Sequence, residues 1–105
     1  MAQVIWTDGA LADLEDIGEY IAKDSIKYAE LTVKELFEYP DILEKFPKIG
    51  KRIDEFNDPT LRQLIKGSYR IVYKIISEDK VEIMVVHNCA RLISNDKITK
   101  RRTNH

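Results

Sequence analysis

The sequence predicts an α+β domain in which two helices pack on one face of an antiparallel sheet. Three observations support this: a short N-terminal apolar run, then two stretches with helical spacing, then three apolar stretches typical of strands. Because both helices precede the antiparallel strands, they must cover a single face of the sheet. The 105 residues fit one domain, which we place at residues 1–95. Residues 96–105 are predicted to be a basic, flexible tail.

The chain begins with an apolar run at residues 3–6, which predicts a short strand. Thr7 or Asp8 follows, and either side chain can cap a helix. Gly18 lies inside this helix at a cost of roughly 1 kcal/mol relative to alanine. We therefore expect a second helix to approach closely at Gly18. The apolar stripe of the first helix comprises Ala10, Leu11, Leu14, Ile17, Gly18 and Ile21.

A second helix is predicted after Asp24-Ser25, which can end the first helix and cap the next. The short link indicates an antiparallel helical hairpin. Pro40 removes a backbone donor and clashes with the preceding turn, so we expect a kink or a restart there. The apolar residues that carry the helical period are Ala29, Val33, Leu36, Phe37 and Leu43.

Three strands are predicted in the second half, at Leu61–Lys66, Tyr69–Ile76 and Val81–His87. The links between them are short, which favours antiparallel neighbours. Residues 51–60 are polar and contain Pro59, and this composition is typical of a loop.

Alternation along the middle strand separates two faces. Ile71, Tyr73 and Ile75 suit the core beneath the helices. Arg70 and Lys74 lie on the other face, which we expect to stay open at least in part. Arg70 either contacts a partner or pairs with Glu82 on the next strand. That other face also holds Val72 and Ile76. On the last strand, strict alternation groups Val81, Ile83, Val85 and His87 against Glu82, Met84, Val86 and Asn88.

Charge is divided unevenly along the chain. Residues 1–46 hold 4 Lys/Arg and 11 Asp/Glu, whereas residues 47–105 hold 13 Lys/Arg and 7 Asp/Glu. The basic half suits a polyanion or an acidic protein, although solvation alone also accounts for it. Cys89 is the single cysteine and forms no internal disulfide, which fits a reducing cytoplasm. No apolar run is long enough for a membrane span, and the two His and one Cys match no metal-ligand spacing.

Several motifs resemble the RelE/ParE toxin superfamily over about residues 3–93. They are Tyr69-Arg70-Ile71-Val72-Tyr73, Val85-Val86-His87 with Arg91, the Trp6-Thr7 start of the first helix, and the Phe46-Pro47 turn with Gly50-Lys51-Arg52. The resemblance, to the ParE branch in particular, implies the fold derived above. It also implies a toxin of a bacterial type II toxin–antitoxin pair, with a cognate antitoxin as partner and no cofactor. RelE-like members cut messenger RNA on the ribosome, whereas ParE-like members inhibit DNA gyrase.

The resemblance also implies a test of nuclease activity, which needs a base, an acid and cations for the phosphate. Arg70 and Arg91 match two cations of the nuclease branch, and His87 is a candidate base, although a structural role for it is favoured. The lysine positions of the preceding strand fall on Leu61 and Gln63, unless the register shifts to Arg62 and Lys66. The tyrosine expected near the C-terminus is absent, since none follows Tyr73.

The incomplete set favours ParE-like action on gyrase. A ribosome-dependent nuclease, and an inactive homologue that only binds an antitoxin, remain alternatives. A homodimer and a toxin–antitoxin hetero-oligomer are both open. The predicted partner-binding cations are Arg52, Arg62, Arg70, Lys74 and Arg91.

Overall fold

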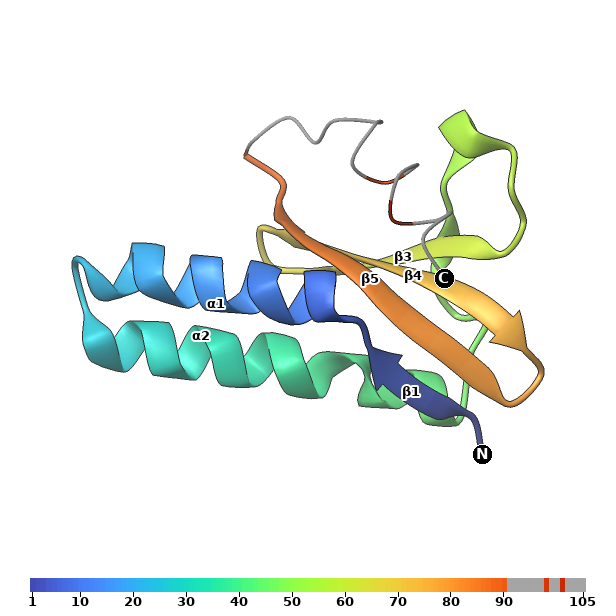
Figure 1. The fold of residues 1–105 in the computed structure, drawn as a ribbon, viewed down its shortest axis with the longest axis horizontal. Helices are drawn as coiled ribbons and strands as arrows, with labels where there is room; N and C mark the ends of the chain where they lie inside the picture. The colour runs from blue at the N-terminus through green and yellow to red at the C-terminus, as the bar shows by residue number, and fades with distance from the viewer. Residues whose placement is uncertain (91–97, 99–100, 102–105) are drawn as a thin grey trace.

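A computed structural model describes residues 1–90, 98 and 101 of the chain. A helical layer lies against one face of a mixed sheet with strand order β1-β5-β4-β3-β2 (Figure 1). The helices are α1 (Asp8–Ala22) and α2 (Ile26–Glu38), followed by the short 3-10 helices η1 (Tyr39–Glu44) and η2 (Asp54–Phe56). The strands are β1 (Gln3–Trp6), β2 (Lys51–Arg52), β3 (Leu61–Lys66), β4 (Tyr69–Ser77) and β5 (Lys80–Asn88).

The predicted α+β architecture, with a meander of β3, β4 and β5 and both helices on one face, is confirmed. The sheet is nevertheless mixed, because β1 runs parallel to β5, with Val4 opposite Val81. A parallel pair requires a long connection, and the helical hairpin after β1 begins such a connection. No tight turn therefore fixes the direction of β1 relative to its neighbour.

Both predicted helix caps are present. The Thr7 hydroxyl accepts a hydrogen bond from the Ala10 amide at 3.2 Å and donates one to the Ile83 carbonyl at 2.8 Å. Thr7 thus starts α1 and joins it to β5. The Ser25 hydroxyl accepts from the Tyr28 amide at 3.1 Å and starts α2.

The predicted close approach of the helices is found at Gly18. A Cβ atom at this position would lie 3.0 Å from the Val33 side chain of α2. The expected interruption at Pro40 is also confirmed, since the α-helix ends at Glu38 and η1 begins with Pro40 in its first turn. In the first turn of a helix, proline loses no hydrogen bond through its missing N–H, and its fixed φ already suits the helix.

Residues 51–60 differ from the predicted loop. Lys51 and Arg52 form β2, paired with Gln63 and Arg62 of β3, and η2 follows. A strand of two residues is too short to produce an alternating pattern, so the sequence carried no sign of it.

A β-bulge changes the predicted faces of β5. Val72 lies opposite Val85, but the next residue, Tyr73, lies opposite Ile83, which leaves Met84 as an extra residue on β5. Val86 therefore joins Ile83 on the helix side, and Val85 turns to the other face. The predicted grouping of Val85 with Val81 and Ile83 is wrong for this reason.

Two apolar clusters lie on opposite faces of the sheet. The cluster beneath the helices comprises Ala10, Leu14, Leu36, Leu43, Leu64, Ile71, Tyr73, Val81, Ile83 and Val86. The other, on what we call the second face, comprises Ile53, Leu61, Val72, Met84, Val85 and Ile98, with Phe56 packed against it.

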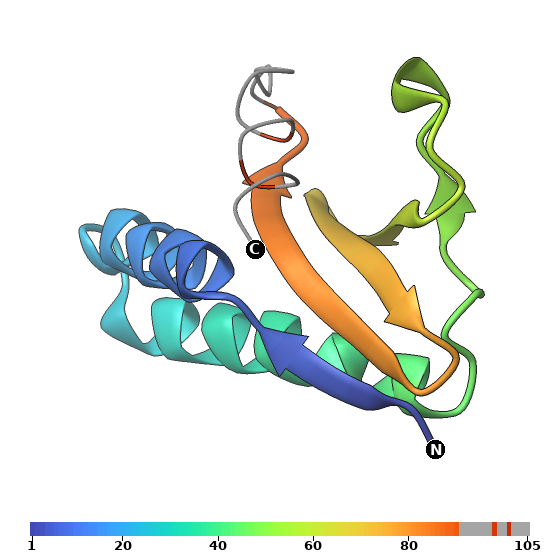
Figure 2. The ribbon, with the colours of Figure 1, turned by 45° about the vertical axis from the view of Figure 1, so that its right-hand side comes forward.

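The second face, expected to stay open at least in part, is covered over this cluster by other segments of the chain. The segment that carries η2 lies on the side of the sheet away from the helices (Figure 2). Its residues Ile53 and Phe56 pack in the second-face cluster. Ile98 is only 1% exposed and completes the cluster. Val72, predicted to be half-exposed, is fully buried. Ile98 and Arg101 are the described members of the predicted flexible tail, and the other residues of 96–105 lie outside the described residues.

Candidate functional site

Two of the predicted cations flank the second-face cluster. Arg70 and Lys74 lie on β4 two residues before and two residues after the buried Val72, and both side chains are half-buried. Strand alternation therefore places them on the face opposite the helices, as predicted. This arrangement offers two cations at the edges of an apolar patch, which suits a macromolecular partner with anionic groups.

The cross-strand partners of these cations differ from the expected pairing. Glu82 lies opposite Lys74, and His87 lies opposite Arg70, so the predicted Arg70–Glu82 pair is wrong. The bulge at Met84 lies between these two pairs and shifts the register by one residue, but neither register brings Arg70 opposite Glu82. Arg70 and His87 are thereby neighbours on the second face, where a guanidinium and an imidazole can together meet a phosphate or a carboxylate.

Hydrogen-bonding capacity is left over on this face. Arg70 Nε and Gln63 Oε1 are both buried, and neither has a hydrogen-bond partner among residues 1–90, 98 and 101. Gln63 lies opposite Val72, so the two atoms come from neighbouring strands beside the same cluster. A buried polar atom without a partner costs free energy, and a bound partner can remove that cost.

Strand β3 adds no cation to the second face over its described length, Leu61–Lys66. Leu61 lies opposite Lys74, and Ile65 lies opposite Arg70, with Gln63 between them. Arg62 and Lys66 alternate with these residues and lie on the helix side. The register shift that would have restored the charge is absent from this strand.

The other predicted partner-binding cations are dispersed. The Arg62 guanidinium donates from Nη1 to the carbonyls of Gly50 at 3.0 Å and Lys48 at 3.2 Å, so it holds the chain between η1 and β2. Arg52 lies opposite Arg62 and is exposed. Arg91 lies outside the described residues. Of the four predicted cations that the structure describes, it therefore brings together only Arg70 and Lys74.

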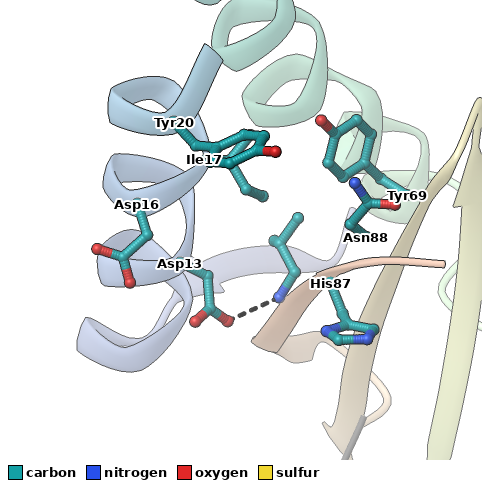
Figure 3. A pocket seen from close by; sticks show the side chains of 8 residues that line it. Asp13, Asp16, Ile17, Tyr20, Tyr69, His87 and Asn88 are labelled. Carbon is teal, nitrogen blue, oxygen red and sulfur yellow. Dashed lines mark hydrogen bonds between the residues drawn. The ribbon is translucent and has the colours of Figure 1, made fainter. Parts of the chain in front are cut away.

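A polar pocket of about 240 Å³ lies between α1 and the ends of β4 and β5. Tyr20 of α1 and Tyr69 of β4 point toward one another across it, beside Asn88, and the His87 imidazole lies on the opposite side of β5 (Figure 3). The pocket therefore joins the helix side to the end of the second face at His87. Its remaining lining residues are Asp13, Asp16, Ile17 and Val86.

An apolar groove runs between α1 and α2 on the outside of the molecule. Its lining offers very little polar surface, and Ile26 and Phe37 are respectively 69% and 48% exposed. The Phe37 ring stacks on Trp6 with 5.2 Å between ring centroids. An exposed apolar surface of this kind is typical of interaction sites. Its lining residues are Leu14, Glu15, Gly18, Glu19, Ala22, Ile26, Ala29, Glu30, Val33, Lys34 and Phe37.

This groove was not predicted from the sequence, although a sign of it was present. The apolar stripe of α1 is wider than one buried face needs, because Gly18 and Ala22 extend it beyond Ala10 and Leu14. Only the packing of α1 against α2 decides which part of a wide stripe is buried.

Comparison with a solved structure places the fold in a known class. A chain described as "Chromosomal ParDE TA system from P. aeruginosa" superposes with a TM-score of 0.69 over 84% of this chain and 96% of that chain, at 20% sequence identity. Two helices on one face of a mixed five-stranded sheet are thus a fold that this chain shares with that solved chain.

Two sequence comparisons define the family more closely. The family described as "ParE toxin of type II toxin-antitoxin system, parDE" matches residues 4–93. A protein named "Toxin RelE2", from Caulobacter vibrioides (strain ATCC 19089 / CIP 103742 / CB 15), is 33% identical over 92 residues, which are 88% of this chain and all of that protein. The chain belongs to the ParE toxin family and is the toxin of a type II toxin–antitoxin system. Within the described residues, no helix has the length and apolar character needed to cross a membrane.

Proposed function

We propose that this toxin inhibits DNA gyrase and does not cleave RNA. The observation that carries the proposal is the register of β3, which puts Leu61, Gln63 and Ile65 on the second face. The nuclease branch, as the sequence resemblance implies, uses lysines where Leu61 and Gln63 stand. Without them the scissile phosphate would lose much of its charge stabilisation. A binding surface with two cations and an apolar patch suits inhibition by contact instead.

A supercoiling assay with purified gyrase tests this proposal. The wild-type toxin is expected to inhibit supercoiling. Arg70→Ala should weaken inhibition by at least about tenfold, because a hydrogen bond to a charged group contributes roughly 1.5–3 kcal/mol. Lys27→Ala removes an exposed cation of α2 and serves as the matched control, which should inhibit like the wild type. Full gyrase activity at a large excess of toxin would refute the proposal.

A ribosome-dependent ribonuclease is the second candidate function. The pairing of Arg70 with His87 on adjacent strands favours it, because a cation and a base are then next to one another. Cleavage of messenger RNA on purified ribosomes, abolished by Arg70→Ala and by His87→Ala, would establish this alternative. Because we propose inhibition of gyrase, we expect no cleavage.

In cells, the two targets differ in which process stops first. Under the gyrase proposal, induction of the toxin should stop DNA synthesis before protein synthesis.

We further propose that a cognate antitoxin binds the apolar groove between α1 and α2 and that the pair forms a hetero-oligomer in the cytoplasm. The groove supports this, since its exposed apolar lining and its acidic rim at Glu15, Glu19 and Glu30 suit an amphipathic segment with basic flanks. A neighbouring gene for a protein of about 80 residues, too small for a large core of its own, would supply this partner.

Two substitutions test the groove. Ile26→Asp places a charge in it, whereas Leu31→Asp places one on an exposed apolar residue of α2 outside it. Antitoxin affinity measured by calorimetry should fall at least about tenfold for Ile26→Asp only, because a buried unpaired charge is costly. Equal affinities would place the antitoxin elsewhere. Antitoxin binding without toxicity or either activity would identify an inactive homologue.

A further inference from the structure

Arg101 enters a site formed by α1 and β5, 88 positions away from Asp13 in the chain. Its Nη1 lies 2.7 Å from Asp13 Oδ2 and its Nη2 lies 3.2 Å from Asp13 Oδ1, so the guanidinium meets the carboxylate with two prongs. Nη1 also donates to the Met84 carbonyl at 2.9 Å. Met84 is the extra residue of the β5 bulge. Paired N–H donors of this geometry distinguish a guanidinium from an ammonium.

The acceptor side of this site is held in place by the fold. The Asp13 side chain is 7% exposed, and its Oδ2 accepts a further hydrogen bond from the Val86 amide at 2.9 Å. Because the bulge turns Val86 toward the helix layer, the carboxylate is fixed between helix and strand. With Arg101 in place the carboxylate is buried, and a buried carboxylate is strongly destabilised without a cation.

Gly9 forms the flat wall of the site. A Cβ atom there would lie 3.0 Å from Arg101 Nε and 3.1 Å from Cζ, so the guanidinium plane lies against bare backbone. A cavity of about 410 Å³ remains around it, lined by Thr7, Asp8, Gly9 and Met84 together with Arg101. Two acceptors and a flat wall together fit one planar cation.

Arg101 follows Ile98 by three residues, and Ile98 is buried in the second-face cluster. We propose that the pocket of Asp13, Met84 and Gly9 is a guanidinium-binding site that Arg101 fills, and that this occupancy tethers Ile98 to the second face. A guanidinium from another molecule fills the same site but carries no tether, so it leaves Ile98 free to detach. This inference does not depend on whether gyrase or the ribosome is the target.

Thermal unfolding with methylguanidinium tests the site. A ligand that binds only the folded state raises Tm. In about 20 mM methylguanidinium, the Tm of Arg101→Ala should be about 3 °C higher than in the same concentration of methylammonium. A shift of this size follows from weak ligand binding to the folded state of a domain of this length. Wild type, whose site is occupied, and Asp13→Asn with Arg101→Ala, which lacks the carboxylate, should show no such gain.

Equal responses of Arg101→Ala and the double variant would overturn the site. If Arg101→Ala is unfolded in the absence of methylguanidinium, circular dichroism replaces Tm as the readout. Methylguanidinium should then restore the folded signal and methylammonium should not, and failure to restore it would also overturn the site.

The tether is tested by NMR of the same variants. In Arg101→Ala with methylguanidinium, the Val86 amide should stay protected from hydrogen exchange, because Asp13 still accepts from it. The Ile98 methyl signals should move to the positions of an exposed isoleucine. Ile98 signals that match those of the wild type would refute the tether, whatever the Tm experiment shows about the site.

Discussion

The phenolic oxygen of Tyr73 lies 2.9 Å from the amide nitrogen of Gly50 and accepts its hydrogen bond in the interior of the protein. The same hydroxyl donates to the Pro47 carbonyl at 2.8 Å. Tyr73 of β4 thus binds the turn after η1 through two hydrogen bonds. Arg62 of β3 binds the same turn by donating to the carbonyls of Lys48 and Gly50. Two of the motifs that resembled the toxin superfamily, around Gly50 and around Tyr73, are therefore the two halves of one structural contact.

Tyr73→Phe should lower the free energy of unfolding by about 2 kcal/mol, because the Gly50 amide and the Pro47 carbonyl both lose a partner in a site with little access to water. Urea denaturation measures this. Tyr28→Phe removes a hydroxyl from a side chain that is 61% exposed and should change the stability by less than about 0.5 kcal/mol. Similar losses in the two variants would contradict the role given to Tyr73.

The stability that the Tyr73 hydroxyl contributes should depend on pH in the alkaline range. Burial raises the pKa of Tyr73 above its usual value of 10.0, although the Gly50 hydrogen bond and the Arg62 charge oppose the shift. The unfolded chain therefore releases the tyrosine proton first. The stability that Tyr73 contributes is complete below pH 10 and declines as the pH rises from there through the folded-state pKa. Urea midpoints between pH 9 and 11 should fall less steeply for Tyr73→Phe than for wild type, and parallel curves would contradict this.

Gly50→Ala and Gly67→Ala should be destabilising for different reasons. A Cβ at Gly50 would lie 2.5 Å from the Tyr73 hydroxyl oxygen and 2.9 Å from the Gln63 carbonyl oxygen, an overpacking that costs about 2–3 kcal/mol. Gly67 has φ +60 with nothing within 4 Å, so alanine there pays only backbone strain of about 1 kcal/mol.

A double-mutant cycle separates these two costs. Gly50→Ala should couple with Tyr73→Phe, because the two residues touch, whereas Gly67→Ala should be additive with it within about 0.5 kcal/mol. Additivity for both pairs would show that the Gly50 cost does not arise from Tyr73.

Gly18→Ala should depend on its neighbour in α2. Alanine raises the helix propensity by about 1 kcal/mol, but its Cβ would lie 3.0 Å from Val33 and force that side chain to move. In a Val33→Ala background the obstacle is removed. Gly18→Ala should then stabilise the protein by about 1 kcal/mol in that background and by clearly less in wild type. Equal effects in both backgrounds would show that the helices do not meet at Gly18.

Most helices and strands could be predicted because their signals are local. Thr7 and Ser25 cap helices through side-chain oxygens three residues away, and Pro40 ends α2 through its own ring. The bulge at Met84 has no local signal, because an apolar residue fits either face of a buried strand. The faces of β5 were therefore predicted correctly only up to the bulge.

The candidate site was less predictable for the same physical reason. Arg70 and Lys74 were placed on the correct face by alternation alone. The structural role of Arg62 depends on carbonyls of residues 48 and 50, which a strand pattern does not show. The groove between α1 and α2 depends on how far Gly18 lets the helices approach, and the Asp13–Arg101 contact joins opposite ends of the chain.

By itself the sequence determined the order of the two long helices and of β1, β3, β4 and β5, the helix caps and the break at Pro40, and the superfamily, since each rests on residue types at short spacing. Tertiary structure alone decided that β1 is parallel to β5, that Ile53 and Ile98 cover part of the second face, and that Asp13 receives Arg101. Those contacts link residues far apart in the chain, and their energy comes from burial and geometry that exist only after the chain has packed.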